Sequence, residues 1–386
     1  MTKAPAAQYY PAPVPGPANF PAPAPGRPGS NRPRIFAAVG AAVVVLLVLV
    51  GVVTLAGKES GGPESPSYAA ISVGRSTEFA DPAVDSGTGS IYVSNQDKTV
   101  SVIDGRTNRV TATIALAESV TQLAVDPALS RLYAVYPGDQ RDNRPGGVII
   151  VDTATNTSVA TVQTGKQALS IAVDPVTHLV YVTNLQSFES VHQAPADMAN
   201  RHSALTVIDP RTASVLESIS VGSAAFHTEI DETARTAYVI TKYQNPDRMN
   251  PETGILVVDL DSRRTIDFIA LPAAGNGNDL VLDPVSRTAY AKYDDLIYAV
   301  DLARRTVLAT IDTDGHGLLT ADRATHTAYV TQAEYLDGEI LVIDTLNGQS
   351  KDSIPAGDSP LFGFAADPVT HTLYLRTAGE LVVVPR

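Results

Sequence analysis

Residues 172–184 read AVDPVTHLVYVTN, and this stretch decides the fold because the chain carries several variants of it. Its first part is a short apolar run that ends in Asp-Pro. Its second part is a run of β-branched and aromatic residues that begins a few positions later. Two such runs separated by turn residues are typical of adjacent antiparallel strands. The stretch therefore predicts a two-stranded unit that the rest of the chain repeats.

From Tyr68 onward the pattern is found seven times. The first run ends at Asp81, Asp126, Asp174, Asp231, Asp283, Asp322 and Asp367. The second run is IYVSN (91–95), LYAVY (132–136), VYVTN (180–184), AYVIT (237–241), AYAKY (289–293), AYVTQ (328–332) or LYLRT (373–377). A third run ends at Asp104, Asp152, Asp209, Asp259, Asp301, Asp344 or Pro385, and a fourth closes most units. Four short strands per unit, with no competing helical period, predict an all-β, seven-bladed β-propeller over residues 68–386.

The two ends of this region predict how the ring closes. The seventh unit stops after its third strand, LVVVP at 381–385, and lacks a fourth. The segment YAAISV at 68–73 resembles a fourth strand and has no unit of its own. We expect it to pair with the last blade, because that pairing leaves no open sheet edge.

The VYVTN run, with AVDP before it and LTVIDPRT (205–212) after it, resembles the YVTN-family β-propellers. The resemblance covers residues 68–386, with one full match and six degenerate copies. It implies the propeller fold and leaves function broad, since the family includes surface-layer proteins, binding proteins and relatives of propeller lactonases. The absence of Trp argues against a WD-repeat propeller.

The region before the propeller predicts a membrane anchor. Residues 1–34 hold ten prolines, four basic residues and no acid, which is typical of a disordered tail. Residues 35–56 are 22 apolar or small residues that span about 33 Å as a helix. Because the basic residues precede this segment, we expect a cytoplasmic N-terminus and an extracytoplasmic propeller after the linker 57–67. The alternative is a signal peptide cleaved after Ala56.

Composition excludes several classes of function. The residues after Ala56 carry 24 basic and 41 acidic side chains, a net charge of −17, which disfavours nucleic-acid binding. The chain has no Cys, and it shows no phosphate-binding glycine loop, HExxH, EF-hand or G-x-S-x-G motif. We therefore predict no cofactor, no metal ion and no assigned catalytic residue. A two-histidine metal site from His227 and His316 would lack a third ligand.

Differences in spacing place the variable surface between the second and third strands. The connections there are long in blades two (136–147), three (184–203) and four (242–254), which are neighbours. They leave the propeller on the side where each innermost strand begins, so this face and the adjoining channel mouth are the predicted binding site. The polar residues expected to line it are His227, Asp279, His316, Asn278, Glu229, Arg141, Arg144, His192, His202 and Arg248. By contrast, His178, His326 and His371 recur at one repeat position and are expected to be structural turn residues.

Three functions are compatible with these features. The first, which we favour, is a non-catalytic domain that recognises a protein, a glycan or a small molecule outside the cytoplasm. The second is a hydrolase of the propeller lactonase type, which would require a compact His, Glu and Arg cluster at the channel mouth. The third is an envelope scaffold, which differs from the first mainly in the size of its partner. Fold alone does not choose among them.

Overall fold

The computed structural model describes residues 68–77, 81–139, 141–185, 203–243, 252–273, 277–313, 317–332, 338–357 and 359–386. These residues form twenty-eight strands and no helix. Accordingly, no helix within these ranges is long and apolar enough to cross a membrane. The proline-rich tail, the predicted transmembrane segment 35–56 and the linker 57–67 lie outside the described residues, so the predictions for them stay predictions.

The strands form seven antiparallel sheets of four strands each, numbered here as blades one to seven. Blades one to three consist of β2 (Ala83–Asp85), β3 (Ser90–Asn95), β4 (Thr99–Asp104) and β5 (Arg109–Ala115); β6 (Gln122–Asp126), β7 (Arg131–Tyr136), β8 (Gly146–Asp152) and β9 (Thr157–Gly165); and β10 (Ala168–Val173), β11 (Val180–Leu185), β12 (Ser203–Asp209) and β13 (Ser214–Ser220). Blades four and five consist of β14 (Ala224–Asp231), β15 (Thr236–Tyr243), β16 (Glu252–Asp259) and β17 (Arg264–Ala270); and β18 (Gly277–Asp283), β19 (Thr288–Tyr293), β20 (Leu296–Asp301) and β21 (Thr306–Asp312). Blades six and seven consist of β22 (Leu319–Asp322), β23 (Thr327–Gln332), β24 (Gly338–Asp344) and β25 (Gln349–Gly357); and β26 (Gly363–Ala366), β27 (Leu373–Arg376), β28 (Glu380–Val384) and β1 (Ala69–Ser72).

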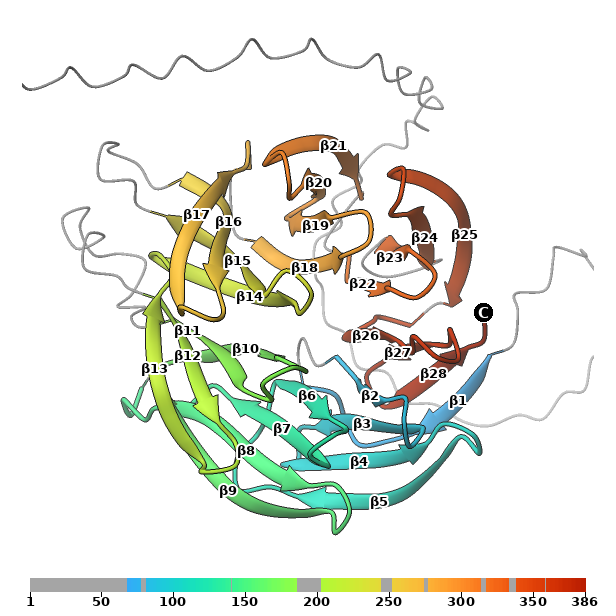
Figure 1. Ribbon diagram of the computed structural model, residues 1–386. Coiled ribbons are helices and arrows are strands. Elements are labelled where there is room, and N and C mark those ends of the chain that lie inside the picture. The colour runs from blue at the N-terminus through green and yellow to red at the C-terminus, as the bar shows by residue number, and fades with distance from the viewer. Residues whose placement is uncertain are drawn as a thin grey trace, which may run out of the picture. The chain divides into compact units, whose positions relative to one another are not determined.

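The innermost strands of consecutive blades lie next to one another, and β2 of blade one also contacts β26 of blade seven. The sheets therefore form a closed ring (Figure 1), and the space enclosed by its innermost strands is called the channel below. Apolar side chains fill the layers between blades; fully buried Tyr133, Tyr181 and Tyr290 are among the largest. The predicted seven-bladed propeller with four-stranded blades is confirmed.

The ring closes as the sequence predicts. β1 pairs antiparallel with β28, with Ile71 opposite Leu381 (Figure 1). Ile71 is 7% exposed and packs in a cluster that includes Ile91 of blade one and Tyr374 of blade seven. One side chain of the closing strand therefore joins the first and the last blade.

A buried arginine reinforces this seam. Arg376 is fully buried, and burial lowers its pKa to about 10. Its guanidinium donates to the carbonyl oxygens of Glu380 and Gly74 and to Oδ1 of Asn95. No carboxylate is among the partners found for it within the described ranges. Arg376 therefore connects blade seven, the end of the closing strand and blade one through neutral acceptors.

The innermost strand of every blade ends at a buried Asp or directly before one, and the carboxylate of this Asp caps the following turn. Asp174, for example, accepts from the backbone N–H of Val176 and is fully buried. In blade one, this position belongs to Asp85, which accepts from the N–H groups of Gly87 and Thr88. Our assignment of Asp81 to it was wrong, because AVDS at 83–86 is the true counterpart of AVDP and Asp81 lies four residues earlier.

The turn histidines also join neighbouring blades. Nδ1 of His178 lies 2.9 Å from Oδ2 of Asp126 in blade two, and Nδ1 of His371 lies 2.7 Å from Oδ2 of Asp322 in blade six. His326 approaches Asp283 in the same way, and Arg235 donates to Asp174 from the same repeat position. All of these turn residues have positive φ, 62° at His178. The left-handed turn thus aims each side chain at the buried Asp of the preceding blade.

This contact predicts a cost for His178→Asn. Asn tolerates the left-handed backbone but is shorter, so Oδ2 of the buried Asp126 loses its contact with His178, while Oδ1 keeps the N–H of Leu129. We expect the free energy of unfolding to fall by about 1–3 kcal/mol in urea denaturation followed by circular dichroism. Ser130→Asn is the matched control, since Ser130 holds the equivalent position in blade two at φ 52° and is exposed. Equal losses in both variants would mean that the contact contributes nothing.

Candidate functional site

The ends of the channel open on two different faces of the ring. The loop face carries the connections between second and third strands and those between blades. The turn face carries the turns between first and second strands and between third and fourth strands. Each innermost strand runs from the loop face to the turn face. The further a residue lies before the Asp at the end of the strand, the nearer it lies to the loop face. The residue four positions before the Asp lies nearer the loop face than the residue two positions before it.

His227 is the centre of an ionisable cluster in the channel. Its Nδ1 lies 3.4 Å from Oδ1 of Asp279, and its Nε2 lies 3.7 Å from Oε1 of Glu229. The side chain of His227 is 14% exposed and that of Asp279 is 15% exposed. His227 and Glu229 belong to β14, whereas Asp279 belongs to β18 of the next blade. One histidine thus lies between two carboxylates from adjacent blades.

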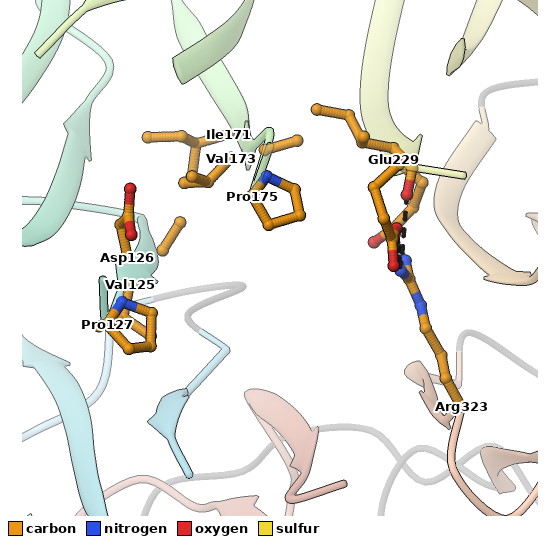
Figure 2. A pocket seen from close by; sticks show the side chains of 12 residues that line it. Val125, Asp126, Pro127, Ile171, Val173, Pro175, Glu229 and Arg323 are labelled. Atoms are coloured by element: carbon orange, nitrogen blue, oxygen red, sulfur yellow. Dashed lines mark hydrogen bonds and ion pairs between the residues drawn. The ribbon is translucent and has the colours of Figure 1, made fainter. Parts of the chain in front are cut away.

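Arg323 extends this cluster toward the turn face. Its guanidinium donates to Oε2 of Glu229, and its Nη1 lies 3.6 Å from Oε2 of Glu232. Arg323 follows Asp322 in the first turn of blade six, whereas Glu229 and Glu232 come from blade four. The ion pair therefore spans the channel between two blades that are not neighbours (Figure 2).

These neighbours set the protonation of His227 and Glu229. Burial alone would lower the pKa of His227, but the carboxylates of Asp279, Glu229 and Asp81 outweigh it and raise the pKa to about 9. Burial opposes ionisation of Glu229, yet Arg323 and His227 hold its pKa below the ordinary value. At neutral pH we therefore expect an imidazolium between carboxylates and an ionised Glu229.

The pKa values of Asp81 and Asp279 are raised, whereas that of Glu229 is lowered. Burial, together with the negative charge of Asp279, raises the pKa of Asp81 to about 7. Burial also raises the pKa of Asp279, against the opposing effect of His227 and two backbone N–H groups. Oδ1 of Asp81 accepts from the N–H of Phe364 in blade seven, and Oδ2 of Asp279 accepts from the N–H of Leu319 in blade six. Both carboxylates therefore also link adjacent blades.

A cavity of about 300 Å³ opens beside the Glu229–Arg323 pair on the turn side. Figure 2 shows that its two sides differ. Mostly apolar groups of blades two and three, with the Asp126 carboxylate beside them, form one wall, and Glu229 and Arg323 stand opposite. The lining comprises Ala124, Val125, Asp126, Pro127, Ile171, Ala172, Val173, Pro175, Glu229, Ile230, Glu232 and Arg323.

The structure brings together three of the predicted site residues: His227, Asp279 and Glu229. The backbone of Asn278 lies beside Asp279 in β18, and its side chain is outside the description. Arg141 and Arg144 are exposed on the loop face of blade two, where Arg144 contacts Glu118 and Asp139 and not the channel. The remaining predictions fall outside the described residues: His316, His192, His202 and Arg248.

Sequence reasoning missed Asp81, Glu232 and Arg323. Asp81 was missed because we took it for the Asp that ends the innermost strand of blade one. That residue is Asp85, and Asp81 lies four residues before it, as His227 and Asp279 lie four residues before theirs. Glu232 and Arg323 directly follow the Asp at the end of the innermost strand, a position where four other blades have Pro. Opposite charges at a position that is usually Pro could have predicted an ion pair across the channel.

The cluster is suited to holding charge in place rather than to activating a nucleophile. His227 is flanked by carboxylates on both ring nitrogens, so neither nitrogen is an available general base while the imidazolium persists. Over the described ranges, no group of three or more His, Asp or Glu side chains is arranged to hold a metal ion. The arrangement can bind and orient a charged group at the turn-side cavity.

No family model and no curated protein matches the chain. Among solved structures, hydrazine synthase from Kuenenia stuttgartiensis is similar in fold, with a TM-score of 0.65 and 15% sequence identity. The superposition covers 86% of this chain and 99% of that chain. At such low identity the similarity shows the propeller fold alone.

Proposed function

We propose that this protein is a membrane-anchored, extracytoplasmic recognition domain of the YVTN propeller type. It binds a protein, glycan or small molecule through the loop face of blades two to four. Residues 35–56 hold it in the bilayer with the N-terminus in the cytoplasm. The observation that carries the proposal is that four ionisable side chains of the channel, those of His227, Glu229, Asp279 and Arg323, are paired with one another.

This pairing favours binding over hydrolysis. A lactonase-type hydrolase needs a base or a metal-held water poised at the substrate, with its proton acceptor free. Here the imidazole and the guanidinium each contact two carboxylates. Such a network leaves neither side chain available as the base of a hydrolase.

The long connections provide the variable surface that recognition requires. In blade two the described part of this connection is ordered by a short bridge between Asp139 and Arg144. Arg144 also lies 3.3 Å from Glu118 in the connection between blades one and two. Charged groups of adjacent blades are thus held together on the face that we propose for binding.

The full chain, recovered from the membrane fraction in detergent, is the bait for the test of this function. We expect it to retain a specific partner from solubilised cell envelope. Replacing residues 186–202 by a Gly/Ser segment of equal length should abolish capture, because the side chains of this connection are lost while its length is kept. Alanine at His227, Asp279 and His316 should leave capture largely unchanged.

The same preparations are assayed for hydrolysis of a simple lactone. Activity in the unmodified chain that disappears in the triple variant would replace recognition by the hydrolase function. Capture that is equal with and without the side chains of 186–202 would exclude the loop face as the binding surface.

A further inference from the structure

The turn-side cavity lies at the other end of the channel from the proposed loop-face site. It is about 300 Å³, enough for an unbranched chain of several carbon atoms with a polar end. Val125, Pro127, Val173 and Pro175 give one wall a mainly aliphatic surface, which also holds the carboxylate of Asp126, itself in contact with His178 (Figure 2). The opposite wall bears Glu229, Glu232 and Arg323. The cavity thus offers an apolar path that leads to a charged end.

Carboxylates outnumber cations at this end. Glu229 and Glu232 share Arg323. Deeper in the channel, His227 is shared by Glu229 and Asp279. Glu232 is the most accessible of these carboxylates, since its side chain is 39% exposed and its contact with Arg323 is 3.6 Å long. An incoming cation would therefore add a favourable contact without displacing the Glu229–Arg323 pair.

An anionic guest is disfavoured for the same reason. It would have to compete with two glutamates for Arg323 and would approach a domain, residues 68–386, of net charge −16. The field of such a domain attracts cations and repels anions before any contact is made. An apolar guest without charge would use the aliphatic wall but would leave the rim carboxylate without a new partner.

We propose that this cavity binds an aliphatic primary ammonium group, either the side chain of a lysine on another protein or a free aliphatic amine. The methylene chain lies along the wall of Val125, Val173 and Pro175. The ammonium group donates to Glu232 at the rim and to Glu229 behind it. The site does not depend on the loop-face function, so the failure of either proposal leaves the other intact.

The test is calorimetric titration of the full chain in nanodiscs with Nα-acetyl-lysine methylamide. We expect a dissociation constant of about 1 mM or tighter, in keeping with the small size of the probe. The Nε-acetylated form of the same probe lacks the charge and should bind about tenfold more weakly or not at all. 1,5-Diaminopentane serves as the second probe: binding of the diamine alone identifies a free amine as the ligand, and binding of the capped lysine identifies a protein side chain.

Glu232→Gln should weaken binding of the charged probe about tenfold, because it removes the rim charge and retains the shape. Glu217→Gln is the matched control, as Glu217 lies on an outer strand and has a similarly long contact, 3.8 Å, with Arg263. It should leave binding unchanged. Equal affinity for the charged and the Nε-acetylated probe, equal effects of the two variants, or no heat with either amine would overturn the proposal.

Discussion

Ile71→Asp is expected to remove about 4 kcal/mol of the free energy of unfolding, since it combines the loss of a buried aliphatic side chain with the burial of a charge. Ile71 is 7% exposed and packs between the first and last blades. With an aspartate there, β1 cannot stay on β28, and both strands present open edges. We therefore also expect concentration-dependent association of the variant.

The measurement is urea denaturation of the full chain followed by far-UV circular dichroism, because the chain has no Trp to report by fluorescence. Ala70→Asp is the matched control: Ala70 is the neighbouring residue of the same strand, it is exposed, and its carboxylate would stay in water. The control should change stability by less than about 0.5 kcal/mol. If the two variants unfold at the same urea concentration, the closing strand does not hold the ring together.

The ring could be predicted from sequence because its determinants are local and repeated. Each blade alternates apolar strands with turn residues, and seven copies make this pattern unambiguous. The segment 68–73 belonged to no unit, and the seventh unit was the one that lacked a fourth strand. The buried core follows from the same pattern, since VYVTN at 180–184 is buried throughout. Local chemistry and global fold agree at these positions.

The channel cluster could be predicted only in part because it depends on geometry across the ring. His227 and Asp279 were found because they break the repeat at one known position. Arg323 joins them through a contact between residues 94 positions apart, which no local pattern encodes. Asp81 was lost through a register error of four residues, from Asp85 to Asp81, in the blade with the shortest innermost strand, Ala83–Asp85. The sites of polar residues in a repeat protein are thus predicted from the alignment of its repeats, and one misaligned repeat removes a residue from the predicted site.

His227 predicts how the stability of the propeller depends on pH. The pKa of its imidazolium is about 9 in the folded state and 6.5 in the unfolded chain, so folding favours the protonated ring. This contribution, about 3 kcal/mol, is complete below pH 6.5 and is lost as the pH rises through about 9. Asp81 acts at lower pH. Its pKa is about 7 in the folded state and 3.8 in the unfolded chain, so its contribution to stability falls as the pH rises from about 4 to about 7.

His227→Gln should therefore destabilise the chain most below pH 6.5 and progressively less above it, with the difference from the unmodified chain nearly gone by about pH 10. Urea denaturation at several pH values gives this difference. Histidine-selective NMR of both chains identifies the His227 resonance and its midpoint. Asp279→Asn should lower that midpoint, since Asp279 is the strongest of the carboxylates that raise it, and the amide oxygen can still accept from Leu319. A loss of stability in His227→Gln that stays constant from pH 6 to pH 10 would show that the ring contributes by packing and not by charge.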